Sequence, residues 1–206
     1  IETRKAVTIN KGNYTFKDLN KNGILDPYED WRLPVQERIS NLLSLMTLEE
    51  KVGLMFHPNI AVTADGAIKY DLSDEERQSL EAEGKEFGSR GFLPGQVKPS
   101  ATAKLYIEEK NFRCILNNGI ADPRTFATWS NGMQEIAEAS RLGIPIMFST
   151  DPRHGAVLQA HIEGQQLFSQ WPSTEGQVGI TATRDLDLMK KYGEVTAEEY
   201  RAVGLH

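Results

Sequence analysis

Apolar positions first fall into a helical pattern between residues 35 and 46. They recur every three or four residues and predict one amphipathic helix, whose apolar face consists of Val35, Ile39, Leu42, Leu43 and Met46. Pro34 stands at the first turn of this helix, where a proline is tolerated. A second helix is predicted to begin after Thr47, because Thr47 and Glu50 have the spacing of a capping box. The apolar run that follows, KVGLMFHPNI, fits a buried strand or a helix end, since periodicity does not separate the two.

The second half of the chain alternates between strand and helix patterns. A short strand at 110–119 is closed by an Asn-Asn-Gly turn. A helix is predicted within 122–143, with Gly143 ending it and with an apolar face made of Phe126, Trp129, Met133, Ile136 and Ala137. The run IPIMFST at 144–150 is continuously apolar, as expected of a parallel strand buried on both faces. A last helix is predicted at 184–205, with Leu188, Tyr192 and Val195 on one side.

These lengths of strand and helix favour an α/β fold. Residues 64–100 interrupt the pattern, because they are charged, rich in glycine and short of apolar residues. We interpret this stretch as a surface excursion, mainly a solvated loop, with one helical stretch at 73–83.

Composition narrows the class of protein. The chain has 206 residues, of which 39% are hydrophobic and 25% are charged, as in a soluble globular protein. The net charge of -6 and the absence of a basic stripe argue against nucleic-acid binding. No apolar run approaches the roughly 20 residues that span a bilayer. The chain begins at Ile1 and not at Met, so we expect a removed leader and a secreted or periplasmic location.

Residues 18–29, DLNKNGILDPYE, match the twelve-residue loop that binds Ca²⁺ in EF-hands. Such a loop turns sharply at a glycine in its sixth position, and here Gly23 stands there. The predicted ligands are Asp18, Asn20, Asn22, the backbone carbonyl of Ile24, Asp26 and Glu29. The alternative interpretation is an Asn/Asp/Gly turn that caps a helix. Because Pro34 stops a long exiting helix and no second loop follows, a bound Ca²⁺ is expected to act as a structural clip.

Asp151 is the candidate for chemistry, because it follows the predicted buried strand directly. In a β/α barrel the C-terminal ends of the strands form the active face, so an acid there is well placed to meet a ligand. An acid before Pro152 is also consistent with an ordinary turn or a helix cap. Position alone leaves these two interpretations equal.

Three separated stretches resemble family 3 glycoside hydrolases. The string NGMQEIAEASRLGIPIMFSTDPRHG at 131–155 is similar to the N-terminal barrel domain of that family, where an N-x-x-Q-x-x-A-E helix precedes R-L-G-I-P and a strand ending in D-x-x-H-G. Residues 26–55, with their M-T-L-E-E-K-V-G element, resemble the entry helix of the family. Residues 170–206 resemble its segment of W-P, A-T-x-D and an E-x-R-A-x-G helix.

This resemblance implies the N-terminal portion of a (β/α)8 TIM-type barrel in residues 35–206, after a lead-in at 1–34. It implies part of a retaining, exo-acting glycosidase for terminal β-linked glucosides or related β-glycosides, with carbohydrate as partner and no organic cofactor. Asp151 matches the acid that binds sugar hydroxyls in the −1 subsite, a task that suits a carboxylate because it accepts from two hydroxyls. Arg153 and His154 match positions that brace this site.

The family's nucleophile and general acid lie in later segments, so we expect no catalytic residue within this chain. A barrel takes ~250 residues and eight strands, and retention needs two carboxyl groups about 5–5.5 Å apart. The expected partner is therefore the remainder of the same enzyme. One alternative is a non-catalytic, calcium-clipped module that binds carbohydrate or a protein. Another is a related N-acetylhexosaminidase or glycoside phosphorylase on the same barrel.

Overall fold

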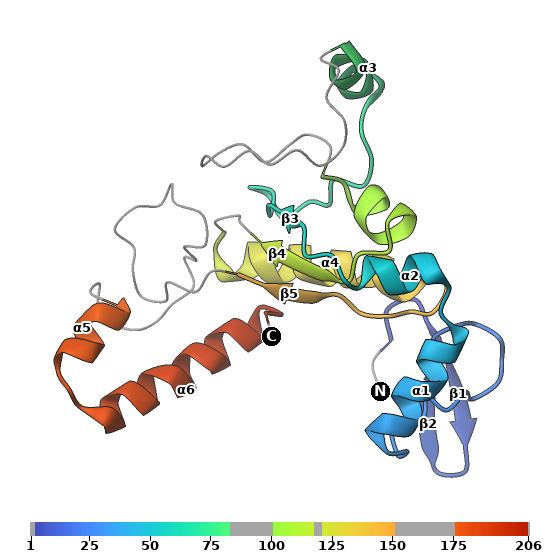
Figure 1. The fold of residues 1–206 in the computed structure, drawn as a ribbon, viewed down its shortest axis with the longest axis horizontal. Coiled ribbons are helices and arrows are strands. Elements are labelled where there is room, and N and C mark those ends of the chain that lie inside the picture. The colour runs from blue at the N-terminus through green and yellow to red at the C-terminus, as the bar shows by residue number, and fades with distance from the viewer. Residues whose placement is uncertain (1–2, 83–100, 118–120, 151–175, 206) are drawn as a thin grey trace.

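The computed structural model describes residues 3–82, 101–117, 121–150 and 176–205 (Figure 1). Its strands form a two-stranded antiparallel sheet near the N-terminus and a three-stranded sheet further along the chain. The small sheet, the loop after it and helix α1 (Val35–Leu45) form one lobe at the lower right of Figure 1. The larger sheet lies at the centre of the molecule, and helix α3 (Asp74–Ala82) projects away from it at the top. The predicted α/β class is therefore confirmed.

The N-terminal hairpin pairs β1 (Val7–Lys11) with β2 (Tyr14–Asp18). Gly12, in the turn between them, has a φ of 62°, a left-handed conformation that glycine adopts without a steric cost. Alternation along β2 places Tyr14, Phe16 and Asp18 on one face of the hairpin. Phe16 is completely buried on that face.

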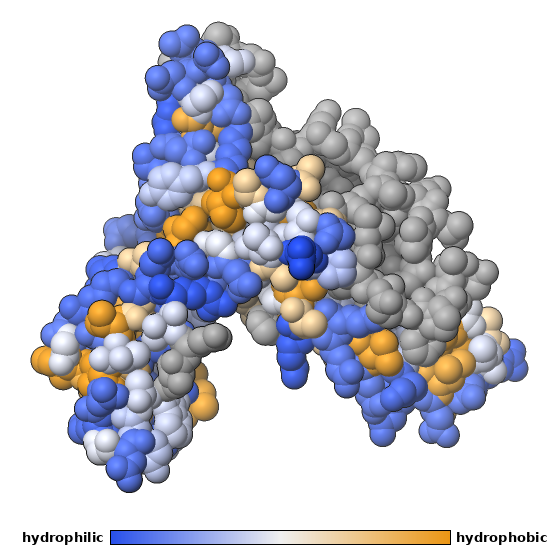
Figure 2. Space-filling model, turned by 180° about the vertical axis from the view of Figure 1, so that it is seen from behind, coloured by the Kyte–Doolittle hydropathy of each residue, from blue (hydrophilic) through white to orange (hydrophobic). Residues whose placement is uncertain are grey.

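Two helices, α1 and then α2, lie between the hairpin and the larger sheet in the sequence. The predicted capping box is confirmed at the start of α2 (Leu48–Gly53), where the Glu50 amide donates to Thr47 Oγ1 and the Thr47 amide donates to the Glu50 carboxylate. The apolar stripe of α1 is largely exposed, and Figure 2 shows apolar side chains on the surface of this lobe. The exposed members of the stripe are Val35, Ile39 and Leu43.

The larger sheet is parallel and its strands follow the order of the chain. β3 (Asn59–Ile60) pairs with β4 (Cys114–Asn117), and β4 pairs with β5 (Met147–Ser149). Leu205 adds an isolated parallel bridge to Phe148, at the edge of β5 opposite β4. The apolar run at 51–60 contains both predicted structures, because it begins with the end of helix α2 and finishes with strand β3.

The apolar core lies between the sheet and α4 (Pro123–Ala139), whose buried face includes four of the five predicted residues: Phe126, Trp129, Met133 and Ala137. The ring of Trp129 lies 5.1 Å from that of Phe148 in β5, centroid to centroid. Tyr200 from α6 (Leu186–Ala202) and Val203, the residue after it, belong to the same core. Asp185 caps α6, whose range matches the predicted helix at 184–205 closely.

Two expectations need correction, and a third is confirmed. α4 ends at Ala139, before Gly143, because Ser140 leaves the helical conformation and its hydroxyl donates to the Ala137 carbonyl. Met147 is 52% exposed, so β5 is covered on one face by the described residues, where both faces were expected to be buried. The helical stretch predicted at 73–83 is confirmed as α3, which begins after Ser73, where the Ser73 amide donates to the Glu76 carboxylate and the Glu76 amide donates to Ser73 Oγ.

Two further helical elements are short. Residues Lys104–Glu109 form η1, a short π-helix that the sequence pattern did not predict. Its wide turn is seen in the bond from the Lys110 amide to the Leu105 carbonyl, five residues back. α5 (Gly176–Ala182) precedes α6 and packs against it.

Candidate functional site

The predicted substrate-binding residues Asp151, Arg153 and His154 lie outside the described residues. The described part of this segment ends at Thr150, the residue before Asp151. The hydroxyl of Thr150 donates to the carbonyl oxygen of Asn117 over 3.1 Å, which joins the C-terminal ends of β4 and β5. The structure therefore describes how the strand that leads to Asp151 is held, and the contacts of Asp151 itself stay a prediction.

The start of β5 is bound to α4 through Gln134. Its side-chain amide donates to the carbonyl of Ile146 over 2.6 Å and accepts from the amide of Ile146 over 3.0 Å. One carboxamide thus satisfies both backbone groups of the residue before β5, as a neighbouring strand would do. Gln134 is the glutamine of the N-x-x-Q-x-x-A-E pattern, so this part of the motif holds the strand in register with the helix.

Arg113 holds the same segment from the side of β4. Its guanidinium is almost fully buried and donates to the carbonyl of Ile144, to the hydroxyl of Ser140 and to the carbonyl of Ile107, at 2.9, 3.0 and 2.9 Å. Burial lowers the pKa of Arg113 to about 10, while the Glu50 carboxylate acts in the opposite direction. A charged group this deep is tolerated because nearly all of its donors have acceptors.

Arg141 fixes the turn between α4 and β5 to the first lobe. Its Nε donates to Glu50 over 2.9 Å, and its Nη2 donates to the other Glu50 oxygen and to the Leu45 carbonyl. Burial opposes ionisation of Glu50, but the hydrogen bonds from Arg141 and the Thr47 amide, together with the positive charges of Arg141 and Arg113, outweigh it, and the pKa of this carboxyl lies below its usual value. Glu50 therefore serves both as part of the capping box of α2 and as the acceptor for Arg141.

One polar contact lies on the face of the sheet opposite α4. Because Phe148 points toward α4, Ser149 points to the other face. There Ser149 Oγ lies 2.7 Å from Nε2 of His57, a residue just before β3. This hydrogen bond crosses the sheet, since β4 lies between β3 and β5. The sequence did not single out His57 or Asn117, because their role depends on strand order, which no local pattern reports.

The calcium-like loop closes on itself through hydrogen bonds. The almost fully buried Asp18 accepts from the amides of Asn22 and Gly23, at 3.1 and 2.9 Å. Glu29, also buried, accepts from the amides of Leu19 and Asp26, at 2.6 and 3.0 Å. The first and last acids of the predicted ligand set thus bind the backbone of the loop between them.

The other predicted ligands meet at Asp26. One oxygen of this carboxylate accepts from the amide nitrogens of both Asn20 and Asn22, at 2.7 and 2.8 Å. A half-turn of each carboxamide would bring two oxygens to the same place, which fits the ligand set of Ca²⁺. Ile24 contributes its amide to Asn22 Oδ1 over 2.7 Å, while its side chain is exposed. In the described residues no three His, Cys, Asp or Glu side chains are grouped as a metal site, so Ca²⁺ binding stays a prediction.

The loop is also docked onto the C-terminal end of α4. Lys21, which has a left-handed φ of 61°, donates from Nζ to the carbonyls of Ala139 and Ser140 at 3.0 and 2.9 Å. The hydroxyl of Tyr28 donates to the carbonyl of Leu142 over 3.3 Å. Cations are favoured at helix C-termini, where carbonyl groups lack partners. The loop therefore holds the end of the helix that precedes β5.

Glu138, the last residue of the N-x-x-Q-x-x-A-E pattern, ties the N-terminal segment to the same helix. One of its buried oxygens accepts from the amides of Arg4 and Lys5, both at 2.6 Å, and the other accepts from Lys17 Nζ at 2.8 Å. Burial opposes ionisation of Glu138, but these hydrogen bonds, led by that of Lys17, hold its pKa below the usual range. The motif that resembles an enzyme family thus has two structural roles, in Gln134 and in Glu138.

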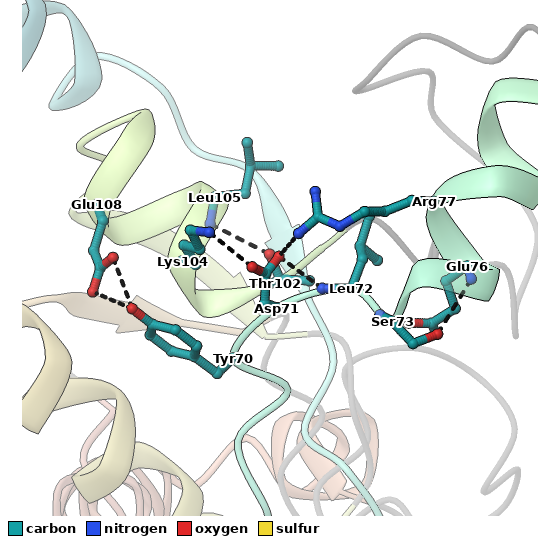
Figure 3. Close-up of polar contacts among 10 residues, drawn as sticks. All are labelled: Tyr70, Asp71, Leu72, Ser73, Glu76, Arg77, Thr102, Lys104, Leu105 and Glu108. Atoms are coloured by element: carbon teal, nitrogen blue, oxygen red, sulfur yellow. Dashed lines mark hydrogen bonds and ion pairs between the residues drawn. The ribbon is translucent and has the colours of Figure 1, made fainter.

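Polar contacts fix the segment between β3 and α3 (Figure 3). Asp71 accepts from Lys104 of η1 over 2.8 Å and from Arg77 of α3. Its hydrogen bond with Lys104 lowers the pKa of the Asp71 carboxyl. Tyr70 donates to the carboxylate of Glu108, at the far end of η1. These contacts attach the excursion to η1, on the side where β3 ends.

Comparison with known proteins gives a consistent result. The family description "Glycosyl hydrolase family 3 N terminal domain" matches residues 47–206. A protein of Dickeya chrysanthemi named periplasmic beta-glucosidase/beta-xylosidase is 34% identical over 210 aligned positions, which cover 100% of this chain and 27% of that protein. Beta-glucosidase C of Emericella nidulans is 32% identical over 189 positions, which cover 91% of this chain and 26% of that protein. The chain therefore spans about a quarter of the length of these relatives. None of the described helices has the length and apolar composition needed to cross a membrane.

Proposed function

The chain belongs to glycosyl hydrolase family 3, and on this premise we propose that it is part of a β-glycosidase that hydrolyses terminal β-linked glucosides or xylosides. The observation that carries the proposal is the way in which β5 is held. Gln134 and Arg113 bind the segment 140–146, directly before the strand that leads to Asp151, and Arg141 within that segment binds Glu50 and the Leu45 carbonyl. A site that must place an acid against one sugar ring needs such a rigid support.

In this proposal, Asp151 accepts hydrogen bonds from sugar hydroxyls, and Arg153 and His154 brace it. Two carboxyl groups about 5–5.5 Å apart carry out hydrolysis with retention, and we place both in polypeptide outside this chain. The relatives support this placement, because the chain aligns with only 27% and 26% of their lengths.

We also propose that β3, β4 and β5 are successive strands of a (β/α)8 barrel. Three features support this. The strands are parallel and adjacent in chain order, and Leu205 forms an isolated parallel bridge to Phe148 beside β5. The face with Ser149 and its contact to His57 lies opposite α4, as the interior of a barrel lies opposite its helices. His57 would then also face the interior of the barrel, because its side chain contacts Ser149.

We further propose that residues 18–29 bind a structural Ca²⁺. The support is the complete ligand pattern, together with the convergence of Asn20, Asn22 and Asp26 described above. Bound Ca²⁺ would supply a central charge that holds these oxygens together. Lys21 and Tyr28 of the loop already bind the end of α4 and the turn after it, so the proposed role of the ion is structural: it stabilises the loop that makes these contacts.

An extracytoplasmic location, secreted or periplasmic, is part of the proposal. Its support is the name of the Dickeya chrysanthemi relative, which describes that protein as periplasmic. Fractionation of cells that express the natural gene tests this location directly. Recovery of the protein in the cytoplasmic fraction alone would contradict it.

The experiment that tests the function is hydrolysis of aryl β-glucoside, β-xyloside and α-glucoside by the full-length protein. We expect cleavage of the β-linked substrates, with the first sugar product in the β configuration. Asp151→Asn removes a charged acceptor worth about 1.5–3 kcal/mol, so kcat/KM should fall about 10- to 150-fold in a protein that folds normally. Unchanged kinetics in this variant would reduce Asp151 to a turn residue, and absence of β-glycoside cleavage would contradict the proposed activity.

A further inference from the structure

A cluster of aromatic side chains lies on the surface of the hairpin lobe. Tyr14 from the start of β2 and Trp31 from the segment after the loop are 48% and 49% exposed, although both are large and apolar. Their rings lie 5.5 Å apart with an interplanar angle of 79°. Neither ring takes part in the core around α4 or in the docking of the loop, so their exposure calls for a separate explanation.

The cluster is rigid. One face of Trp31 stacks on the completely buried Phe16, with centroids 5.8 Å apart and an interplanar angle of 26°. The guanidinium of Arg32 lies over the rings of Tyr14 and Phe16, at 5.2 and 4.8 Å from their centroids. Asp30, which is buried, fixes that guanidinium through bonds to its Nε and Nη2 at 2.8 and 2.6 Å. The exposed rings are therefore held in place before any ligand arrives.

The chemistry of this surface suits a sugar. A pyranose with equatorial hydroxyls presents a face of C–H groups, which are attracted to the electron-rich face of an aromatic ring. Its rim of hydroxyls needs donors and acceptors beside the ring. Arg32 supplies donors there, because its Nη1 has no hydrogen bond to any described residue while Nε and Nη2 bind Asp30.

Other occupants fit less well. A polyanion would meet the acidic loop that begins at Asp18 and ends at Glu29, in a chain with a net charge of -6. A stable protein interface buries about 800 Å² on each partner, far more than two half-exposed rings offer. We propose that Tyr14, Trp31 and Arg32 form a carbohydrate-binding surface that stacks a β-linked oligosaccharide, an inference that rests on the proposed function for the choice of sugar.

This surface is distinct from the proposed hydrolytic site. The hairpin lobe contacts residues 139–142, which precede β5, so it lies at the N-terminal ends of the parallel strands. Asp151 follows the C-terminal end of β5. A sugar chain on Trp31 therefore increases the time that the protein spends on a polymer and leaves the cleavage of small substrates unchanged.

The test uses the full-length protein labelled with 5-fluorotryptophan. The ¹⁹F resonance of Trp31 is assigned as the one missing from Trp31→Phe, and sulfur-linked cellotetraose and xylotetraose, which resist hydrolysis, are then added. We expect a saturable shift of that resonance with at least one of the two probes. A resonance that does not move at millimolar probe concentrations would overturn the proposal, and so would a Trp31 that a small quencher does not reach in the sugar-free protein.

Variants separate stacking from folding. We expect Trp31→Ala to weaken binding of the same probe at least fivefold by calorimetry, Tyr14→Ala to weaken it less, and Trp31→Phe to retain most of it. Phe56→Ala is the matched control, because Phe56 is also an exposed aromatic residue but lies outside the hairpin lobe, and it should change the affinity less than twofold. Hydrolysis of a small aryl β-glucoside should be the same in Trp31→Ala as in the unmodified protein. Equal affinity in Trp31→Ala, or a loss of aryl glucoside hydrolysis, would contradict a separate carbohydrate surface.

Discussion

The two lobes of this chain are held together by different forces. Around the parallel sheet, Trp129, Phe148 and Ile115 are buried against one another, and apolar contact does most of the work. In the hairpin lobe, the attachment to α4 consists of charged and polar groups, chiefly Glu138 and Lys21. Apolar contacts carry no charge that a change of pH can remove or that salt can screen, whereas charged contacts depend on both. The strand leading to Asp151 is therefore supported in two ways. The apolar core around α4 holds it at any moderate pH or salt concentration, whereas the charged contacts of the hairpin lobe weaken when pH or salt changes.

The largest expected effect concerns the apolar support. Trp129→Ala leaves a cavity between α4 and β5 and should lower the free energy of unfolding by about 3–5 kcal/mol. Chemical denaturation of the full-length protein measures this change. The control is Leu48→Ala, because Leu48 is large, apolar and exposed, and its removal should have little effect. Equal effects of the two variants would show that the core is not centred on Trp129.

Calcium provides the next test, on the polar support. An ion that binds only the folded protein stabilises it by about 2.7 kcal/mol at a hundredfold excess over its Kd. The melting temperature of the full-length protein should therefore rise with Ca²⁺ and fall with chelator, and Glu29→Gln should remove this response. Because the proposed role of the ion is structural, kcat well below the melting temperature should change little. A melting temperature that does not change with chelator would show that the loop is an Asn/Asp/Gly turn without a bound ion.

Glu138 makes the polar support sensitive to pH. Hydrogen bonds hold its pKa in the folded state below its value in the unfolded state. Its contribution is therefore present above the unfolded pKa of about 4.3 and is lost as the pH falls through the lower folded pKa. Glu138→Gln should cost about 1–3 kcal/mol at pH 7, since buried backbone amides lose a charged acceptor, and it should flatten the acid limb of the stability curve.

The control for Glu138 lies three residues away on the same helix. Glu135 pairs with Lys5 at 3.6 Å and its side chain is 48% exposed, so Glu135→Gln should change stability by less than about 1 kcal/mol. Stability of both variants is measured by denaturation between pH 3 and 7. If the free energy of unfolding of Glu138→Gln falls at low pH as steeply as that of the unmodified protein, Glu138 is not the source of the pH dependence.

The smallest expected effect belongs to Lys21. A cation at a helix C-terminus contributes about 0.3–1 kcal/mol, so Lys21→Met should lower stability by that amount, and the effect should shrink at high salt. Lys190→Met on the exposed side of α6 is the control, because Lys190 lies away from the helix end. A loss in Lys21→Met that is independent of salt would indicate that the methylene groups of the lysine, and not its charge, support the turn at 139–142.

Local patterns predicted the helices well and the contacts poorly. Residues 35–46, the capping box at Thr47 and the face of α4 were predicted correctly because their signals lie within one turn or two of helix. The end of α4 was not, since Ser140 competes with Gly143 through a side-chain bond that has no sequence signature. The exposure of Met147 was missed for another reason, because a continuous apolar run does not tell how many faces of the strand are covered. The domain boundary at residue 34 stays a prediction.

The sequence by itself determined the family, the helices that begin near residues 35, 48, 123 and 186, and the ligand pattern of the loop at 18–29, because motifs and periodicity are properties of neighbouring residues. Only the tertiary structure decided that Gln134 binds Ile146, that Glu138 and Lys21 attach the first lobe to α4, and that Tyr14 meets Trp31. These pairs join residues from different elements, and their meeting depends on strand order, on helix docking and on the angle at which the loop leaves β2. A sequence pattern specifies which groups need partners, and the packing of the whole chain selects the partner that each one finds.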